Sequence, residues 1–191
     1  MIKRNPKNER IKRQYGEFLK HADGKAKATI RQVEKAIQRY ENFTSSADFA
    51  TFDQGQARAF KAHLVERGLS KATMLSTVTA LKRYFGWLAH QPGYKSRIAI
   101  TDIEYLNLAD KEARAAKAPT DRAYPTIEQV EHAISRMPAR TDIERRDRAF
   151  IAFTAISGVR DGALISLRVK HVDPVRLREI QNPKEVAPKA S

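Results

Sequence analysis

A stripe of apolar residues between positions 71 and 90 constrains the fold more than any other feature of this sequence. Its members recur at spacings of three and four residues, and they are Met74, Leu75, Val78, Leu81, Phe85 and Leu88. At about 100° per residue this spacing places them on one face of an α-helix, whereas a half-buried strand would alternate every second residue. Ser70 is a typical N-cap before the stripe, and Gln91-Pro92-Gly93 ends it. We therefore expect a long helix that packs against other elements.

The rest of the first half repeats this helical periodicity and has no strand pattern. We expect a flexible basic arm at residues 1–8 and further helices over residues 8–22, 29–41, 53–67 and 101–108. The expected caps are Thr29, Asp53 with Gln56, and Thr101 with Glu104. Lys25 and Lys27 fall in the loop before the second of these helices.

A basic, Ala-rich connector separates the two halves. It ends in Ala118-Pro119-Thr120, and proline interrupts a helix. We therefore predict a first domain over residues 1–115, a linker over 116–121 and a second domain over 122–191. In the second domain, the capping boxes Thr126/Gln129 and Thr141/Glu144 predict two helices, which end near Met137 and Ile156.

Arg160 follows the second of these helices directly after Ser157-Gly158. Gly158 can end a helix because glycine adopts the left-handed conformation without a Cβ clash. Leu164 and Leu167 predict a new short helix, and residues 169–173 predict an exit toward a strand or turn. We expect Arg160 to be held between two buried helices, in a position that suits a guanidinium gripping a phosphate.

The charge points to a polyanionic partner. The 191 residues carry a formal net charge of +14. The basic excess is seven for residues 1–70, three for 71–121 and four for 122–191, so it is spread over the whole chain. Solubility alone asks for a net charge of about 2–8 in a small domain. The distribution therefore favours a long polyanion that lies along both halves.

Several classes of protein find no support in the sequence. It has no cysteine, and its five histidines lack the spacing of metal ligands. No apolar run approaches the roughly 20 residues that span a bilayer, and the N-terminus lacks the apolar region of a signal peptide. We expect a cytoplasmic protein with no membrane segment, no metal and no cofactor.

The residues around Arg160 resemble the first catalytic-arginine box of the tyrosine recombinases, the phage-integrase family. That box usually reads Thr-Gly-Leu-Arg, with a Glu three residues after the Arg, then Leu-Arg-Trp and a terminal Asp. The corresponding residues here are Ser157, Gly158, Val159, Arg160, Ala163, Leu167, Arg168, Val169 and Asp173. Ala163 stands in place of the Glu and Val169 in place of the Trp. The first half resembles the core-binding domain of the same family.

The resemblance implies a mainly α-helical fold. The first domain would be a SAM-like core-binding domain of two crossed helical hairpins that clamp duplex DNA. The first helices of an α+β catalytic domain would follow. The family joins DNA strands through a tyrosine nucleophile, with arginines, a lysine and histidines around the phosphate, and it needs no ATP or metal. The implied catalytic residues are Arg160 and Lys189.

Other parts of the family's catalytic set do not occur in this sequence. No histidine has an arginine three residues later, and all six tyrosines precede Arg160. We therefore expect a truncated recombinase that binds duplex DNA and does not cleave it alone. The resemblance implies an oligomer on DNA for the full-length enzyme.

The candidate DNA-binding residues lie opposite the apolar stripe of residues 71–90. Ala72, Ser76, Thr79 and Arg83 share that face, and hydroxyl and guanidinium groups bind phosphates and base edges. A plain solvated face explains the same pattern. Lys25 and Lys27 are candidate phosphate contacts, and the resemblance adds Arg168.

Two other functions remain open from the sequence. One is a non-enzymatic helical DNA-binding protein that acts as a regulator or as a competitor of a full-length recombinase. The other is a helical protein-interaction module with incidental basic charge, which predicts weak DNA binding without site preference.

Overall fold

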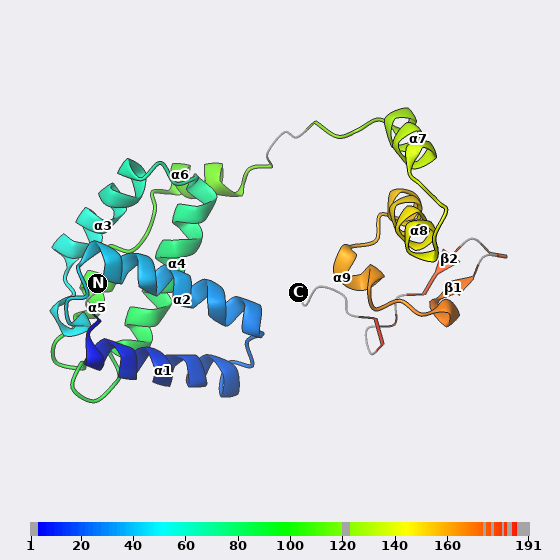
Figure 1. Cartoon of the computed structure of the whole chain (residues 1–191). Coiled ribbons are helices and arrows are strands. Elements are labelled where there is room, and N and C mark those ends of the chain that lie inside the picture. The colour runs from blue at the N-terminus through cyan, green and yellow to red at the C-terminus, as the bar shows by residue number, and fades with distance from the viewer. Residues whose placement is uncertain are drawn as a thin grey trace. The chain divides into compact units, whose positions relative to one another are not determined.

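The computed structural model is mainly helical, as the sequence predicted (Figure 1). It describes residues 4–119, 123–173, 175–176, 178–180, 182 and 185–186. The chain divides into two compact units, Met1–Thr120 and Asp121–Ser191. Each unit is described by itself below.

The first unit consists of helices that pack around one central helix. Its elements are α1 (Pro6–His21), α2 (Lys27–Phe43), the 3-10 turn η1 (Phe49–Thr51), α3 (Gln54–Glu66), α4 (Lys71–Leu88), α5 (Ile100–Ile103) and α6 (Asp110–Lys117). Helices α1 and α2 form one hairpin, and α3 and α4 form the second (Figure 1). Helix α4 contacts α2, α3, α5 and α6, so the apolar stripe found in the sequence lies at the centre of the unit.

The core of this unit is rich in aromatic rings. Tyr40 of α2 meets Phe60 and Phe85 edge to face, in each case with 5.3 Å between ring centroids. Phe52 stacks on Phe85 with a centroid distance of 3.9 Å. Burying a side chain of this size contributes about 1.5–3 kcal/mol. Five members of the predicted stripe are buried, whereas Leu75 is only partly buried.

The observed caps confirm four predictions. The side chains of Asp53, Ser70, Thr126 and Thr141 each accept a hydrogen bond from a backbone N–H three residues later. These bonds satisfy donors that the first turn of a helix leaves without an intrahelical partner.

Three predictions at helix starts are wrong. Helix α1 begins at Pro6, within the predicted arm, because Asn5 caps it and proline is favoured at the first helical position. Helix α2 begins at Lys27 after Ala26, so Thr29 is not its cap and Lys27 is helical. Helix α5 begins at Ile100, after its N-cap residue Ala99. Thr101, the predicted N-cap, therefore lies within the helix and does not cap it.

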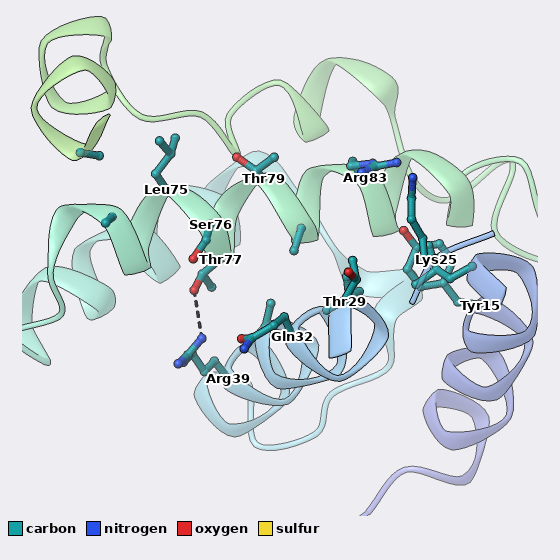
Figure 2. Close-up of a pocket in the computed structure, with 16 residues that line it drawn as sticks. Tyr15, Lys25, Thr29, Gln32, Arg39, Leu75, Ser76, Thr77, Thr79 and Arg83 are labelled. Carbon is teal, nitrogen blue, oxygen red and sulfur yellow. Dashed lines mark hydrogen bonds between the residues drawn. The ribbon is translucent and has the colours of Figure 1, made fainter. Parts of the chain in front are cut away.

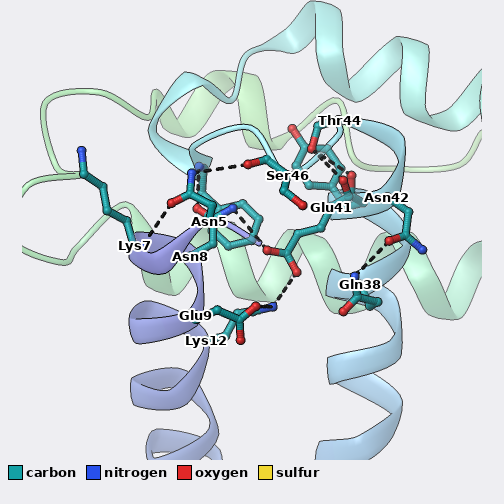
Figure 3. Close-up of polar contacts among 12 residues, drawn as sticks. Asn5, Lys7, Asn8, Glu9, Lys12, Gln38, Glu41, Asn42, Thr44 and Ser46 are labelled. Atoms are coloured by element: carbon teal, nitrogen blue, oxygen red, sulfur yellow. Dashed lines mark hydrogen bonds and ion pairs between the residues drawn. The ribbon is translucent and has the colours of Figure 1, made fainter. Parts of the chain in front are cut away.

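A buried polar cluster joins α1 to the end of α2 (Figure 3). The Asn8 amide donates to Glu41 Oε1 (3.2 Å) and to the Ala47 carbonyl (2.8 Å), while its oxygen accepts from the Phe49 N–H (3.2 Å). Lys12 Nζ lies 2.6 Å from Glu41 Oε2. The cluster therefore fixes the α1–α2 hairpin and the loop after α2 at once.

The second unit has a smaller core. It comprises α7 (Ile127–Arg136), α8 (Asp142–Ser157), α9 (Asp161–Leu164), the turn η2 (Val169–His171) and the antiparallel strands β1 (Val172–Asp173) and β2 (Arg178–Glu179). Gly158 ends α8 in the left-handed conformation (φ 65°), as predicted. Among the described residues of this unit, the apolar cluster contains only Val159, Ala163 and Val186 as buried members. Ile127, Ile156 and Val169 are exposed.

Candidate nucleic-acid interface

A groove of about 560 Å³ lies between α2 and α4 (Figure 2). It gathers side chains from five segments of the sequence: helix α1, the loop before α2, helix α2, helix α4 and helix α6. Four predicted DNA-binding residues line it, namely Lys25, Ser76, Thr79 and Arg83. Alanines at positions 72, 80 and 116 also line the groove, and their small side chains leave room for a ligand.

Arg83 is held at the groove by an acidic neighbour. Its Nη2 lies 3.3 Å from Asp23 Oδ2, and the two side chains are 60% and 29% exposed. A pair this exposed contributes about 0–1 kcal/mol, because water and salt screen it. The contact therefore orients the guanidinium without sequestering it from a ligand.

Arg39 lies farther along the groove and was missed by the sequence reasoning (Figure 2). Its Nη1 donates to Thr77 Oγ1 (3.1 Å), which in turn donates to the Thr73 carbonyl (2.7 Å). Thr77 is buried, so its hydroxyl holds the guanidinium from within the interface between α2 and α4. Only the packing of α2 against α4 reveals this position, since nothing in the spacing of Arg39 distinguishes it from other basic residues on α2.

Two hydroxyl side chains of α4, those of Ser76 and Thr79, are exposed at the groove. Ser76 donates to the Thr73 carbonyl (2.9 Å), so its oxygen faces a ligand as an acceptor. Thr79 lies three residues on, with its side chain exposed. Together with Arg83 they present acceptor and donor groups on one helical face, which is what base edges and phosphates require.

The floor of the groove includes the buried ring of Tyr15. Burial raises the pKa of this phenol, and the nearby charge of Arg83 opposes the shift. Tyr15 therefore stays neutral at physiological pH and adds no negative charge beside the basic residues.

The remaining predicted residues lie outside the groove. Lys27 is the first residue of α2, and its side chain is exposed. Arg160 and Arg168 belong to the second unit, and both are exposed. Lys189 lies outside the described residues.

The expectation that Arg160 sits between two buried helices is wrong for the described residues. Arg160 is the N-cap residue of α9, and its carbonyl accepts from the N–H groups of Ala163 (2.9 Å) and Leu164 (2.8 Å). Its backbone is therefore fixed by the turn. However, α8 contains no buried residue, so the helix before Arg160 does not enclose the guanidinium.

A second polar cluster fixes the backbone at Arg168. The Arg168 N–H donates to Nδ1 of the buried His171 (3.0 Å), which leaves Nε2 as the donor to Glu185 Oε2 (2.8 Å). Lys170 Nζ lies 2.5 Å from the same carboxylate oxygen. Hydrogen bonds from Lys170 and then His171 lower the pKa of Glu185 to about 2.

Neither a metal site nor a membrane span emerges in the part of the chain that the structure describes. No three His, Cys, Asp or Glu side chains within it are grouped so that they could hold a metal ion. None of its helices is long and apolar enough to cross a bilayer.

The first unit is thus a helical domain of two hairpins whose groove is lined by basic and hydroxyl side chains. The family described as "Phage integrase, N-terminal SAM-like domain" matches residues 13–92, from within α1 to just beyond α4.

Curated relatives lead to the same family. Tyrosine recombinase XerC of Xanthomonas campestris pv. campestris (strain B100) is 31% identical over 140 residues, which is 72% of this chain and 39% of that protein. Tyrosine recombinase XerC of Xylella fastidiosa (strain 9a5c) is 30% identical over 128 residues, which is 66% of this chain and 39% of that protein. The chain belongs to the tyrosine recombinase family. Its match spans about two fifths of the length of these relatives, and no solved structure matches it.

Proposed function

We propose that this chain binds duplex DNA through the α2–α4 groove, as the core-binding part of a site-specific recombinase. One observation carries the proposal: Lys25, Ser76, Thr79 and Arg83, chosen as DNA contacts from the sequence, line a single groove. The net charge of +14 supports it, because phosphate neutralisation supplies much of the affinity of any DNA-binding protein.

The groove residues divide into two roles. Lys25 and Arg39 are phosphate contacts, which position the duplex but carry no sequence information. Ser76, Thr79 and Arg83 face base edges from one side of α4. A bidentate arginine–guanine contact is worth about 1–3 kcal/mol against the wrong base, so Arg83 is the main source of site preference. Lys27, at the start of α2, adds a further phosphate contact.

Residues of the second unit belong to the same proposal. Arg160 would bind the scissile phosphate, Arg168 would contact the DNA backbone and Lys189 would assist strand transfer. All six tyrosines of this sequence precede Arg160, so we propose binding without strand cleavage for this chain alone. A cytoplasmic location and assembly into an oligomer on the DNA complete the proposal.

The test compares two labelled duplexes at one stated salt concentration. One comes from the flanks of the chain's own gene and the other is random. We expect a preference of about 10³-fold or more for the first duplex. Arg83→Ala should weaken binding to the preferred duplex by about 5- to 150-fold, which corresponds to 1–3 kcal/mol, and bring it closer to the random duplex.

A matched control removes the same charge elsewhere on the first unit. Arg31 is exposed on α2 and does not line the groove. Arg31→Ala should weaken binding to both duplexes slightly and equally. An Arg83→Ala variant that behaves like Arg31→Ala would contradict the proposed role of the groove.

A further inference from the structure

A second concavity of about 270 Å³ lies beyond Arg39, at the ends of α2 and α3. It is lined by Arg39, Asn42, His63, Leu64, Arg67 and Leu69. Arg39 also lines the α2–α4 groove, so the two hollows share one guanidinium. A ligand that fills the groove past Arg39 therefore reaches the second concavity, which we call the Arg67 pocket.

Three side chains of the Arg67 pocket, those of Arg39, Asn42 and Arg67, can donate hydrogen bonds to a ligand. Arg39 and Arg67 can only donate. The oxygen of Asn42 already accepts from the Gln38 amide (3.0 Å), which leaves its NH₂ group for a ligand. The His63 ring lies 5.2 Å from the Phe43 ring, and that contact fixes its position. Such a set of donors suits an anion with several acceptor oxygens.

The positive charges of Arg39 and Arg67 are not neutralised by carboxylates among the described residues. Among the described residues, neither Arg39 nor Arg67 forms an ion pair with a carboxylate. The last carbonyls of α3 are also occupied, because those of His63, Leu64 and Val65 accept from the N–H groups that follow the helix. Gly68 allows this by adopting a left-handed conformation (φ 64°). Arg67, and the N–H groups of Arg39 that Thr77 does not use, can therefore bind an added anion.

We infer that the Arg67 pocket binds a backbone phosphate of a duplex that lies across the α2–α4 groove. The inference rests on the proposed function, because the duplex must contact the groove before its phosphate can reach the pocket. It deepens that function by adding His63 and Arg67 to the DNA contacts, beside Arg39. These side chains touch a phosphate and no base edge, so they raise affinity equally for every sequence.

The test uses the salt dependence of duplex binding by the full chain. Each phosphate contact contributes about −0.9 to the slope of log K against log salt concentration. Arg67→Ala should reduce the magnitude of that slope by about 0.9 and weaken the preferred and random duplexes by the same factor. Arg67→Lys keeps the charge and should keep most of the slope. Arg31→Ala is the control, because it removes one exposed positive charge from outside both hollows.

Three outcomes separate the possibilities. A slope for Arg67→Ala equal to that of Arg31→Ala, with Arg83→Ala still impaired, overturns the pocket and leaves the proposed function standing. Failure of the unmodified chain to bind either duplex overturns both. The third outcome comes from a separate titration, in which inorganic phosphate is added at constant ionic strength and the NMR signals of the His63 ring are followed. Saturation of those signals in the absence of DNA, together with a salt slope for Arg67→Ala equal to that of Arg31→Ala, would assign the pocket to a free phosphate ligand and overturn the duplex as its source.

Discussion

Glu41 is a buried carboxylate whose removal should unfold the first unit more readily than any surface change on the same helix. Its side chain is 3% exposed, and it receives hydrogen bonds from Asn8 (3.2 Å) and Lys12 (2.6 Å) (Figure 3). A hydrogen bond to a charged group is worth about 1.5–3 kcal/mol. In Glu41→Ala both are lost, although Lys12 keeps its contact with the partly exposed Glu9 (2.7 Å).

We therefore expect Glu41→Ala to lower the free energy of unfolding of this unit by about 3–5 kcal/mol, which is the usual effect of breaking a buried ion pair. Glu41→Gln keeps the shape and an acceptor for Asn8 but leaves Lys12 without a buried anionic partner. Its effect should be smaller, about 1–3 kcal/mol. Both values are large against the roughly 5–15 kcal/mol that stabilises a typical domain.

The assay is urea unfolding followed by the fluorescence of Trp87. It is the only tryptophan of the sequence and lies on α4, so it reports on the first unit alone. Its indole packs 4.9 Å from the Tyr15 ring, a contact that unfolding breaks. Glu34→Ala is the control, because Glu34 is exposed on the same helix and should change stability by less than about 0.5 kcal/mol. Equal losses for Glu41→Ala and Glu34→Ala would refute the reasoning.

The contacts of Lys12 in the same cluster also make the stability of the first unit depend on pH in the alkaline range. Burial alone would lower the pKa of Lys12, but its hydrogen bonds to Glu41 and Glu9 and their charges outweigh burial and raise it above 10.5. A raised pKa means that the folded state holds the proton more tightly than the unfolded chain does. This stabilisation is therefore fully present below about pH 10.5 and is lost as the pH rises through the folded-state pKa.

Three further perturbations test separate parts of the molecule. Tyr84→Phe should raise the free energy of unfolding by about 1 kcal/mol in the Trp87 assay, because the Tyr84 hydroxyl is buried without a partner among the described residues. Asp23→Asn should strengthen duplex binding about two- to fivefold at about 50 mM salt and less at about 200 mM, because it removes a negative charge beside Arg83. The depressed pKa of Glu185, about 2 against its usual 4.5, stabilises the second unit above about pH 4.5, and NMR of its histidine partner should show the contact disappear as the pH falls from there toward 2.

Much of the first unit could be predicted because its signals are local. Helix periodicity, the caps at Asp53 and Ser70 and the stop at Gly68 each depend on a few neighbouring residues. The predicted start of α2 was wrong because the residue at its N-cap position, Ala26, has no side chain that can accept a hydrogen bond. The sequence therefore pointed to Thr29, which does have such a side chain. A cap is a preference that tertiary packing can override.

The groove could be predicted only in part, for a different reason. The spacing of Ser76, Thr79 and Arg83 on one helix already shows that they share a face. Arg39 and Arg67 lie on other elements, and their approach to α4 depends on how the hairpins cross. Asp23, which holds Arg83, is 60 positions away in the sequence. Contacts at that separation leave no trace in a local pattern.

The packing of α2 against α4 links stability to the proposed binding site. Residues such as Tyr40 and Phe85 build the core on one side of this contact, while Arg39 and Thr77 are joined on the other. A substitution that rotates either helix would therefore disturb the core and move Arg39 away from the shared edge of the two hollows. Substitutions confined to exposed side chains, such as Arg83→Ala and Arg67→Ala, avoid that coupling. They are for this reason the sharper probes of DNA binding, and loss of binding in a core variant would say little about the groove.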